Sequence, residues 1–209
     1  MHITACAERG GNEMRKLLLV VLMLGVWATL LAEEFTDGGL EAWTSGTNLT
    51  NWTEDVGGTS TVNQDSADKR SGSYCARSEI DTLGNYAAIY QEVTLDANTE
   101  YEMSYYQKST DAAACEPYLY IRCRKAGDFY NFYLQADTTT WGAGSSLFIA
   151  TLSAAYQQQV YTFTTTDSSG LYRFYIERTG GCNGDTLYYD DLSVTETVSG
   201  GSSRLIIIK

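Results

Sequence analysis

The chain has 209 residues, a formal net charge of −12, sixteen tyrosines, five cysteines and one proline. This length, with strand-like patterns almost everywhere after residue 55, leaves room for one domain and not for two. The negative charge argues against nucleic acid or an anionic membrane as a partner, because an acidic surface is repelled by both.

Residues 1–32 read as a targeting segment. Met14, Arg15 and Lys16 precede the apolar run LLLVVLMLGVWATLLA, which predicts a signal peptide over 14–32 that is cleaved after Ala32. Residues 1–13 are then a start-site extension, and the alternative is an uncleaved anchor. Cleavage would remove His2, the only histidine, and leave no imidazole for Ser-His or Cys-His catalysis or for a His-bearing zinc site. We expect a secreted or cell-surface protein.

Apolar alternation predicts eight strands separated by Gly, Asp, Asn and Ser turns. No ten-residue helical stripe occurs after residue 32. The predicted fold is therefore all-β, a two-sheet antiparallel β-sandwich of the jelly-roll type over 33–198, followed by a Gly/Ser linker and apolar tail over 199–209. The predicted strands cover 73–80, 85–95, 100–108, 117–125, 129–136, 159–166, 171–178 and 186–194.

The last predicted strand changes its register. In GDTLYYDDLSV, Leu187 and Tyr189 share one parity, whereas Leu192 and Val194 share the other. Because side chains alternate between the two faces of a strand, the slip predicts one extra residue, a β-bulge, at Asp190-Asp191.

Several stretches together resemble a known family. DKRSGSYCARSE, YAAIYQEVTLDANTEYEMSYYQKS, QVYTFTTTDSSGLYRFYIERTG and TLYYDDLSVTE are similar to the jelly-roll carbohydrate-binding modules appended to bacterial xylanases and glucanases. The resemblance covers roughly residues 40–196 and rests mainly on SGSY, the YQEVTL and DANTEYEMSYY pair, and the closing YYDDLSV.

The resemblance implies a structural calcium held by the closing aspartates and an early Phe-Glu element. Glu41 in GLEAW is the preferred early ligand, with Asp190 and the turn around Ser71 completing a partial set of oxygen ligands. An alternative register uses EFTDG, with Asp37 or Glu34 compensating for a missing glutamate. The other interpretation is two solvated carboxylates at an ordinary bulge.

The strand order of the jelly roll also assigns the faces. Numbered in chain order, strands 1, 8, 3 and 6 form one sheet and strands 2, 7, 4 and 5 form the other. On the outer face of the second sheet, alternation then predicts ligand-binding residues Tyr90, Tyr118, Tyr120, Arg122, Asn131, Tyr133, Gln135, Arg173, Tyr175 and Glu177.

Aromatic planes beside hydrogen-bonding side chains suit sugars, which offer apolar C–H faces rimmed by hydroxyls. The competing interpretation is structural, because tyrosine is a favoured residue on half-exposed sheets. Trp43 and Trp52 are expected to close one end of the sandwich, and Trp141 to border the groove.

Four cysteines remain after cleavage, and in an exported chain an even number favours disulfides. The strand order brings the loops that hold Cys115 and Cys182 to the same end, so these two are the preferred pair. A bridge between Cys75 and Cys123 stays open: both would lie at the opposite end of the sandwich and could pair, but alternation points Cys75 outward and Cys123 inward.

The sequence favours a secreted, non-catalytic protein that binds a polysaccharide or other glycan. Glu92 with Glu177 is the only carboxylate pair on the candidate face, and no glycosidase motif supports it. The alternative is a structural or adhesive protein that self-associates, with the tail RLIIIK adding to a neighbouring sheet.

Overall fold

The computed structural model divides the chain into two units, Met1–Ala32 and Glu33–Lys209. The structure describes residues 33–80, 82, 84–110, 117–123, 132–135, 137–143, 148–149, 153–167, 169–179 and 186–197. For 117–123, 148–149 and 179 it describes the backbone alone. These described residues contain no helix, and accordingly none that is long and apolar enough to cross a membrane.

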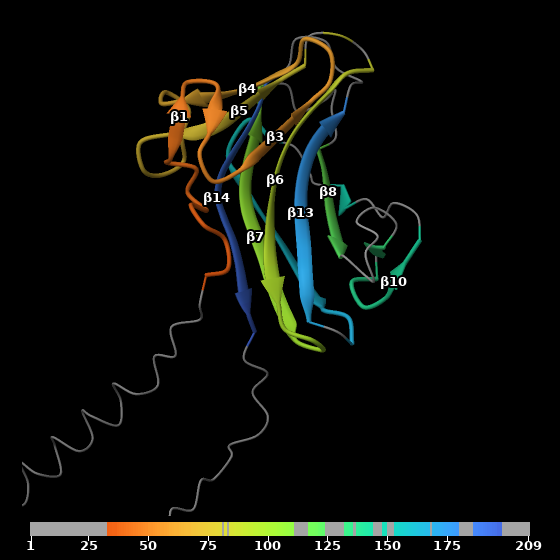
Figure 1. The fold of residues 1–209 in the computed structure, drawn as a ribbon. Coiled ribbons are helices and arrows are strands. Elements are labelled where there is room, and N and C mark those ends of the chain that lie inside the picture. The colour runs from red at the N-terminus through yellow and green to blue at the C-terminus, as the bar shows by residue number, and fades with distance from the viewer. Residues whose placement is uncertain are drawn as a thin grey trace, which may run out of the picture. The chain divides into compact units, whose positions relative to one another are not determined.

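The second unit is built from antiparallel strands, the longest of which lie side by side in Figure 1. Each of the eight predicted strands has a counterpart, although the one predicted over 129–136 is only Tyr133–Leu134. Four strands before residue 73 and the short strands at 141–142 and 148–149 were not predicted. The strands are β1 (Trp43–Ser45), β2 (Asn48–Leu49), β3 (Thr53–Val56), β4 (Thr61–Asp65), β5 (Cys75–Glu79), β6 (Tyr86–Leu95), β7 (Glu100–Ser109), β8 (Pro117–Cys123), β9 (Tyr133–Leu134), β10 (Trp141–Gly142), β11 (Phe148–Ile149), β12 (Gln157–Thr164), β13 (Gly170–Thr179) and β14 (Thr186–Glu196).

The strands form two main sheets and one small one. The five-stranded sheet has the order β12-β7-β14-β5-β4, and the seven-stranded sheet has the order β10-β9-β8-β13-β6-β3, with β11 paired to β8. The strands β1 and β2 pair with each other. Both predicted sheets are therefore confirmed. The first contains β12-β7-β14-β5, which are predicted strands 6, 3, 8 and 1, and the second contains β9-β8-β13-β6, which are predicted strands 5, 4, 7 and 2. The fold is a two-sheet antiparallel β-sandwich.

The core fills the space between the sheets, and the predicted alternation accounts for much of it. In β13, Tyr172, Phe174 and Ile176 are at most 1% exposed, and Ile89 on β6 is fully buried. The ring of Phe35 packs against Trp52 and Phe174, with centroids 4.9 and 5.2 Å apart. Trp52 is thus a core residue near the N-terminal segment, whereas Trp43 is partly buried against the core.

The β-bulge predicted in the last strand is present. The pairing of β14 with β7 shifts its register between Asp190 and Ser193, and Asp191 has φ of 50°. Asp tolerates this left-handed conformation better than most residues. The bulge turns the side chain of Asp190 into a fully buried position.

The N-terminal segment is fastened to the same strand. The amide of Glu34 donates to the carbonyl of Val194 at 2.9 Å, and the amide of Leu192 donates to the carbonyl of Gly38 at 2.8 Å. A Cβ at Gly38 would lie 1.9 Å from the Leu192 carbonyl oxygen, so only glycine allows this approach. The start of the domain and its final strand are thereby held together.

Candidate functional site

The candidate face is the outer face of the seven-stranded sheet, where the register aligns residues in rows across the strands. Residues directly opposite each other on antiparallel strands point to the same face. One row runs Tyr90, Tyr175, Tyr120, and the next runs Glu92, Arg173, Arg122, Tyr133.

Tyr175 lies on this face but is only 4% exposed. Its hydroxyl donates to Asp55 Oδ2 at 2.7 Å, and the Tyr86 hydroxyl donates to Asp55 Oδ1 at 3.0 Å. Tyr86 lies on β6, directly beside β3, whereas Tyr175 on β13 reaches across β6 because Ala88, opposite Asp55, is small and fully buried. Burial and the Asp55 carboxylate raise the pKa of Tyr175 well above its usual range. The expectation that Tyr175 is an exposed ring is therefore wrong, because Asp55 anchors it.

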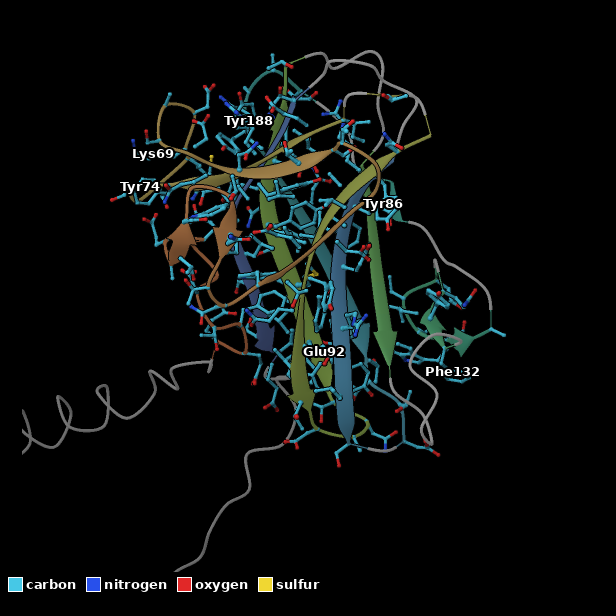
Figure 2. All side chains as sticks on the ribbon, turned by 45° about the horizontal axis from the view of Figure 1, so that its top comes forward. Lys69, Tyr74, Tyr86, Glu92, Phe132 and Tyr188 are labelled. Atoms are coloured by element: carbon cyan, nitrogen blue, oxygen red, sulfur yellow. The ribbon has the colours of Figure 1, made fainter. Side chains whose placement is uncertain are left out.

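Tyr90 is half-buried, and its ring is already engaged by the protein. It stacks on Tyr175 with centroids 5.7 Å apart and an interplanar angle of 17°. The guanidinium carbon of Arg173 lies 4.2 Å from the centroid of the Tyr90 ring, and Arg173 Nε donates to Glu92 Oε1 at 2.8 Å. The side chains of Arg173, Glu92 and Tyr90 thus form one preorganised polar and aromatic unit. Glu92 and Tyr86 mark the position of β6 in Figure 2.

Three more predicted residues lie at the margins of this unit. Glu177, Tyr133 and Gln135 are all half-buried, and Gln135 Nε2 donates to the carbonyl of Tyr133 at 3.0 Å. The neighbouring Trp141 packs edge-on against Tyr172 and donates from Nε1 to the carbonyl of Thr164 at 2.8 Å.

Some predicted residues fall outside what the structure describes. Asn131, Cys115 and Cys182 lie outside the described residues, and for Tyr118, Tyr120 and Arg122 only the backbone is described. The Cys115–Cys182 disulfide therefore stays a prediction. The thiol of Cys75 is free and fully buried, so the Cys75–Cys123 bridge that the sequence left open is not formed.

The predicted calcium ligands converge on one turn, residues 70–74. Asp190 Oδ2 accepts the amide hydrogens of Arg70 and Ser71 at 2.7 and 3.1 Å, and Asp190 Oδ1 accepts that of Asp191 at 2.8 Å. Glu41 Oε1 and Oε2 accept the amide hydrogen of Ser73 at 2.9 and 3.0 Å. The two carboxylates therefore bind neighbouring parts of the same turn.

Asp37 explains how Glu41 reaches that turn. Its two carboxylate oxygens accept the amide hydrogens of Glu41 and Ala42 at 2.8 and 3.0 Å. Gly72 completes the approach with φ of 57°, because a Cβ there would lie 1.8 Å from Glu41 Oε1. Asp37, which the alternative register offers as a calcium ligand, thus holds the backbone at Glu41.

Asp191 and Ser71 add oxygen atoms beside Asp190. The Ser71 hydroxyl donates to Asp191 Oδ1 at 2.6 Å, and Asp191 Oδ2 is ion-paired with Arg70. Burial is the main cause that raises the pKa of Asp190. Carboxylate and hydroxyl oxygens suit Ca²⁺ chemically, but in the described part of the chain no three His, Cys, Asp or Glu side chains gather closely enough to hold a metal ion.

Sequence reasoning missed the residues that fix the candidate face. Asp55 lies on β3, where TEDV carries no apolar alternation that would mark a strand. The Ala at position 88 between two larger outer-face residues was the available signal, because a small side chain leaves room for neighbours to cross above it.

No family model matches the chain, and no curated protein matches it significantly. Solved structures do match it. The carbohydrate-binding module TmCBM61, solved with β-1,4-galactotriose, has a TM-score of 0.53 at 14% identity and covers 79% of this chain and 99% of its own. The family 11 carbohydrate-binding module from Clostridium thermocellum, solved with a mixed-linked tetrasaccharide, has a TM-score of 0.52 at 10% identity, with coverages of 78% and 95%.

A third similar structure belongs to a larger protein. The enzymatically active domain of tailspike protein 4 from bacteriophage CBA120 has a TM-score of 0.55 at 12% identity over 79% of this chain, which spans 21% of the tailspike chain. At such identities the likeness is one of fold. The chain thus has the jelly-roll fold of carbohydrate-binding modules.

Proposed function

We propose that the chain is a secreted, non-catalytic glycan-binding module that uses the outer face of its seven-stranded sheet. The observation that carries the proposal is the row of Glu92, Arg173, Arg122 and Tyr133 across four strands, directly beside the tyrosine row. Strands lie about 4.8 Å apart, which is comparable to the length of one sugar unit in an extended polysaccharide. A glycan that crosses the strands would meet one side chain of the row per unit.

The described side chains support hydrogen bonding more than open stacking. Arg173 and Glu92 are held in place by their ion pair and offer both donors and acceptors to sugar hydroxyls. The Tyr90 ring is partly covered by Arg173, so a sugar would contact its exposed margin. Each hydroxyl loses water when it binds, so the expected affinity is modest.

A glycan array with the full chain tests the proposal, followed by calorimetry with the best ligand. Arg173→Ala and Tyr90→Ala should each lower the affinity by about tenfold. Tyr74→Ala is the matched control, because Tyr74 is half-buried outside the seven-stranded sheet. Equal affinities in all four proteins, or no glycan bound, would refute the proposal.

A structural calcium is part of the proposal. Its ligands would come from Asp190, Glu41 and the turn around Ser71, and its role would be to join the N-terminal segment to the last strand. The full burial of Asp190 supports this assignment, because a buried carboxylate gains most from a nearby cation.

Self-association is a second candidate function, and one edge of the five-stranded sheet favours it. The edge strand β12 reads QQQVYTFT without a charge or a proline, and Val160 within it is 48% exposed. Such edges readily accept another strand. Sedimentation of the full chain and of a chain that lacks 204–209 tests this function: it requires concentration-dependent polymers that disappear with the deletion.

A further inference from the structure

A pocket of about 320 Å³ opens beside the candidate face, between β6 and the N-terminal segment. Its volume is at the small end of the range for ligand pockets. The pocket is lined by Glu34, Thr36, Asn51, Gln91, Glu92, Val93 and Thr94.

The pocket exists because β3 is short. It pairs with β6 only from Ala87 to Tyr90. Beyond Tyr90, the edge of β6 that faces away from β13 therefore has no strand beside it among the described elements. The Gln91 side chain fastens the opposite wall: its Oε1 accepts the Thr36 amide hydrogen, and its Nε2 donates to the carbonyls of Thr36 and Asn51, all at 2.8 Å. Gln91 is 8% exposed, so this wall is held by three partly buried hydrogen bonds.

Glu92 belongs to both the pocket and the candidate face. It pairs with Arg173 in the row that crosses the sheet, and it also lines the pocket. Glu34 faces the same space from the N-terminal segment, and burial and neighbouring carboxylates raise its pKa. A glycan that follows the row from β9 toward β6 would therefore reach the pocket at the N-terminal segment.

We propose that this pocket binds the terminal sugar of a glycan chain, a neutral unit whose adjacent hydroxyls donate to Glu34 and Glu92. The proposal rests on the glycan-binding function and adds to it a preference for chain ends. The terminal unit is neutral because a sugar carboxylate would lie against two glutamates, of which only Glu92 has a cationic partner among the described residues. The pocket takes the end of the glycan because the row of Glu92, Arg173, Arg122 and Tyr133 leads to the pocket wall that Thr36 and Asn51 form.

Calorimetry with the full chain tests the proposal, using the best oligosaccharide from the array in four forms. These have both ends free, a bulky group on one end, a bulky group on the other end, and a uronic acid as the terminal unit. The free form should bind at least tenfold more tightly than the form blocked at the preferred end and the uronic-acid form. Glu34→Gln should reduce the affinity for the free form by about tenfold, and the bulky Thr94→Phe should remove the preference for free ends.

The matched control is Glu196→Gln, which removes one charge near Glu34 outside the pocket. It should leave the affinity unchanged. If Arg173→Ala abolishes binding while free and blocked forms bind equally, the terminal site is wrong and the binding face stands. If no oligosaccharide binds at all, both proposals fail together.

Discussion

Tyr175 on β13 donates its hydroxyl hydrogen to Asp55 on β3, although β6 lies between the two strands. The bond crosses above Ala88, whose side chain is fully buried. Asp55 therefore fixes two tyrosines, Tyr175 and Tyr86, on the outer face. The centre of this face is a packed layer, and a ligand can contact only its exposed margins.

The first prediction concerns this anchor. Asp55→Ala should lower the free energy of unfolding by about 2 kcal/mol, because it leaves the buried Tyr175 hydroxyl without its acceptor. Tyr175→Phe should lower it by about 1 kcal/mol, because Asp55 keeps the bond from Tyr86. Urea denaturation of both single variants and the double variant measures these values.

The double variant is the decisive measurement for this anchor. If the bond is real, the loss in the double variant will be smaller than the sum of the two single losses. Strict additivity would show that Asp55 and Tyr175 do not interact. Glu79→Ala, at the end of β5, is the control: it removes only a partly exposed ion pair with Arg77 and should change the stability by less than about 0.5 kcal/mol.

Local alternation predicted the bulge and the position of the strands, and the jelly-roll strand order then assigned these strands to the two sheets. The parity change between Tyr189 and Leu192 is visible in the printed sequence, and one inserted residue is its simplest cause. The burial of Tyr175 was not predictable in the same way. It depends on Asp55, which lies 120 residues away in a strand with no apolar pattern.

The second prediction concerns Gly72, where the carboxylate of Glu41 occupies the space that a side chain would need. Gly72→Ala should destabilise the fold by at least about 2 kcal/mol, because it combines a left-handed backbone with a steric clash. Gly46→Ala is the matched control, because a Cβ at Gly46 meets nothing within 4 Å. Thermal unfolding should separate the two variants clearly, and equal melting temperatures would mean that Glu41 does not bind this turn.

The third prediction concerns pH. Burial raises the pKa of Asp190 in the folded state above its unfolded value, so the folded chain holds this proton more tightly. The contribution of Asp190 to stability is then fully present below the unfolded pKa and is lost as pH rises through the folded pKa. At the proposed site, calcium would bind the ionised carboxylate, so added calcium should restore stability above that pH and have little effect below it.

Melting temperatures measured with excess calcium and with chelator, at pH 3.5 and pH 7, test this linkage. We expect calcium to raise the melting temperature at pH 7 and to leave it nearly unchanged at pH 3.5. Asp190→Ala should abolish the calcium effect, whereas Asp191→Asn, which tolerates the left-handed backbone and loses only a partly exposed ion pair, should retain it. An unchanged melting temperature on chelation at pH 7 would remove calcium from the proposal.

The fourth prediction concerns the thiol of Cys75, which is fully buried on β5. Burial raises its pKa to about 12, and the thiolate is the reactive form. The Tyr156 side chain interacts with the Cys75 thiol, and its hydroxyl holds the loop that contains Asp68 by donating to the Asp68 carbonyl at 2.8 Å. Cys75 should therefore resist alkylation in the folded chain.

Iodoacetamide at pH 8, followed by peptide mass spectrometry, measures this protection residue by residue. Cys75 should remain unmodified in the folded chain and become fully modified in 6 M guanidinium chloride (roughly this concentration unfolds most domains). Tyr156→Phe should accelerate the labelling of Cys75, because it frees the loop from its hydrogen bond while nearly preserving the shape of the ring. Rapid labelling of Cys75 in the unmodified fold, or its recovery in a disulfide, would contradict the buried free thiol.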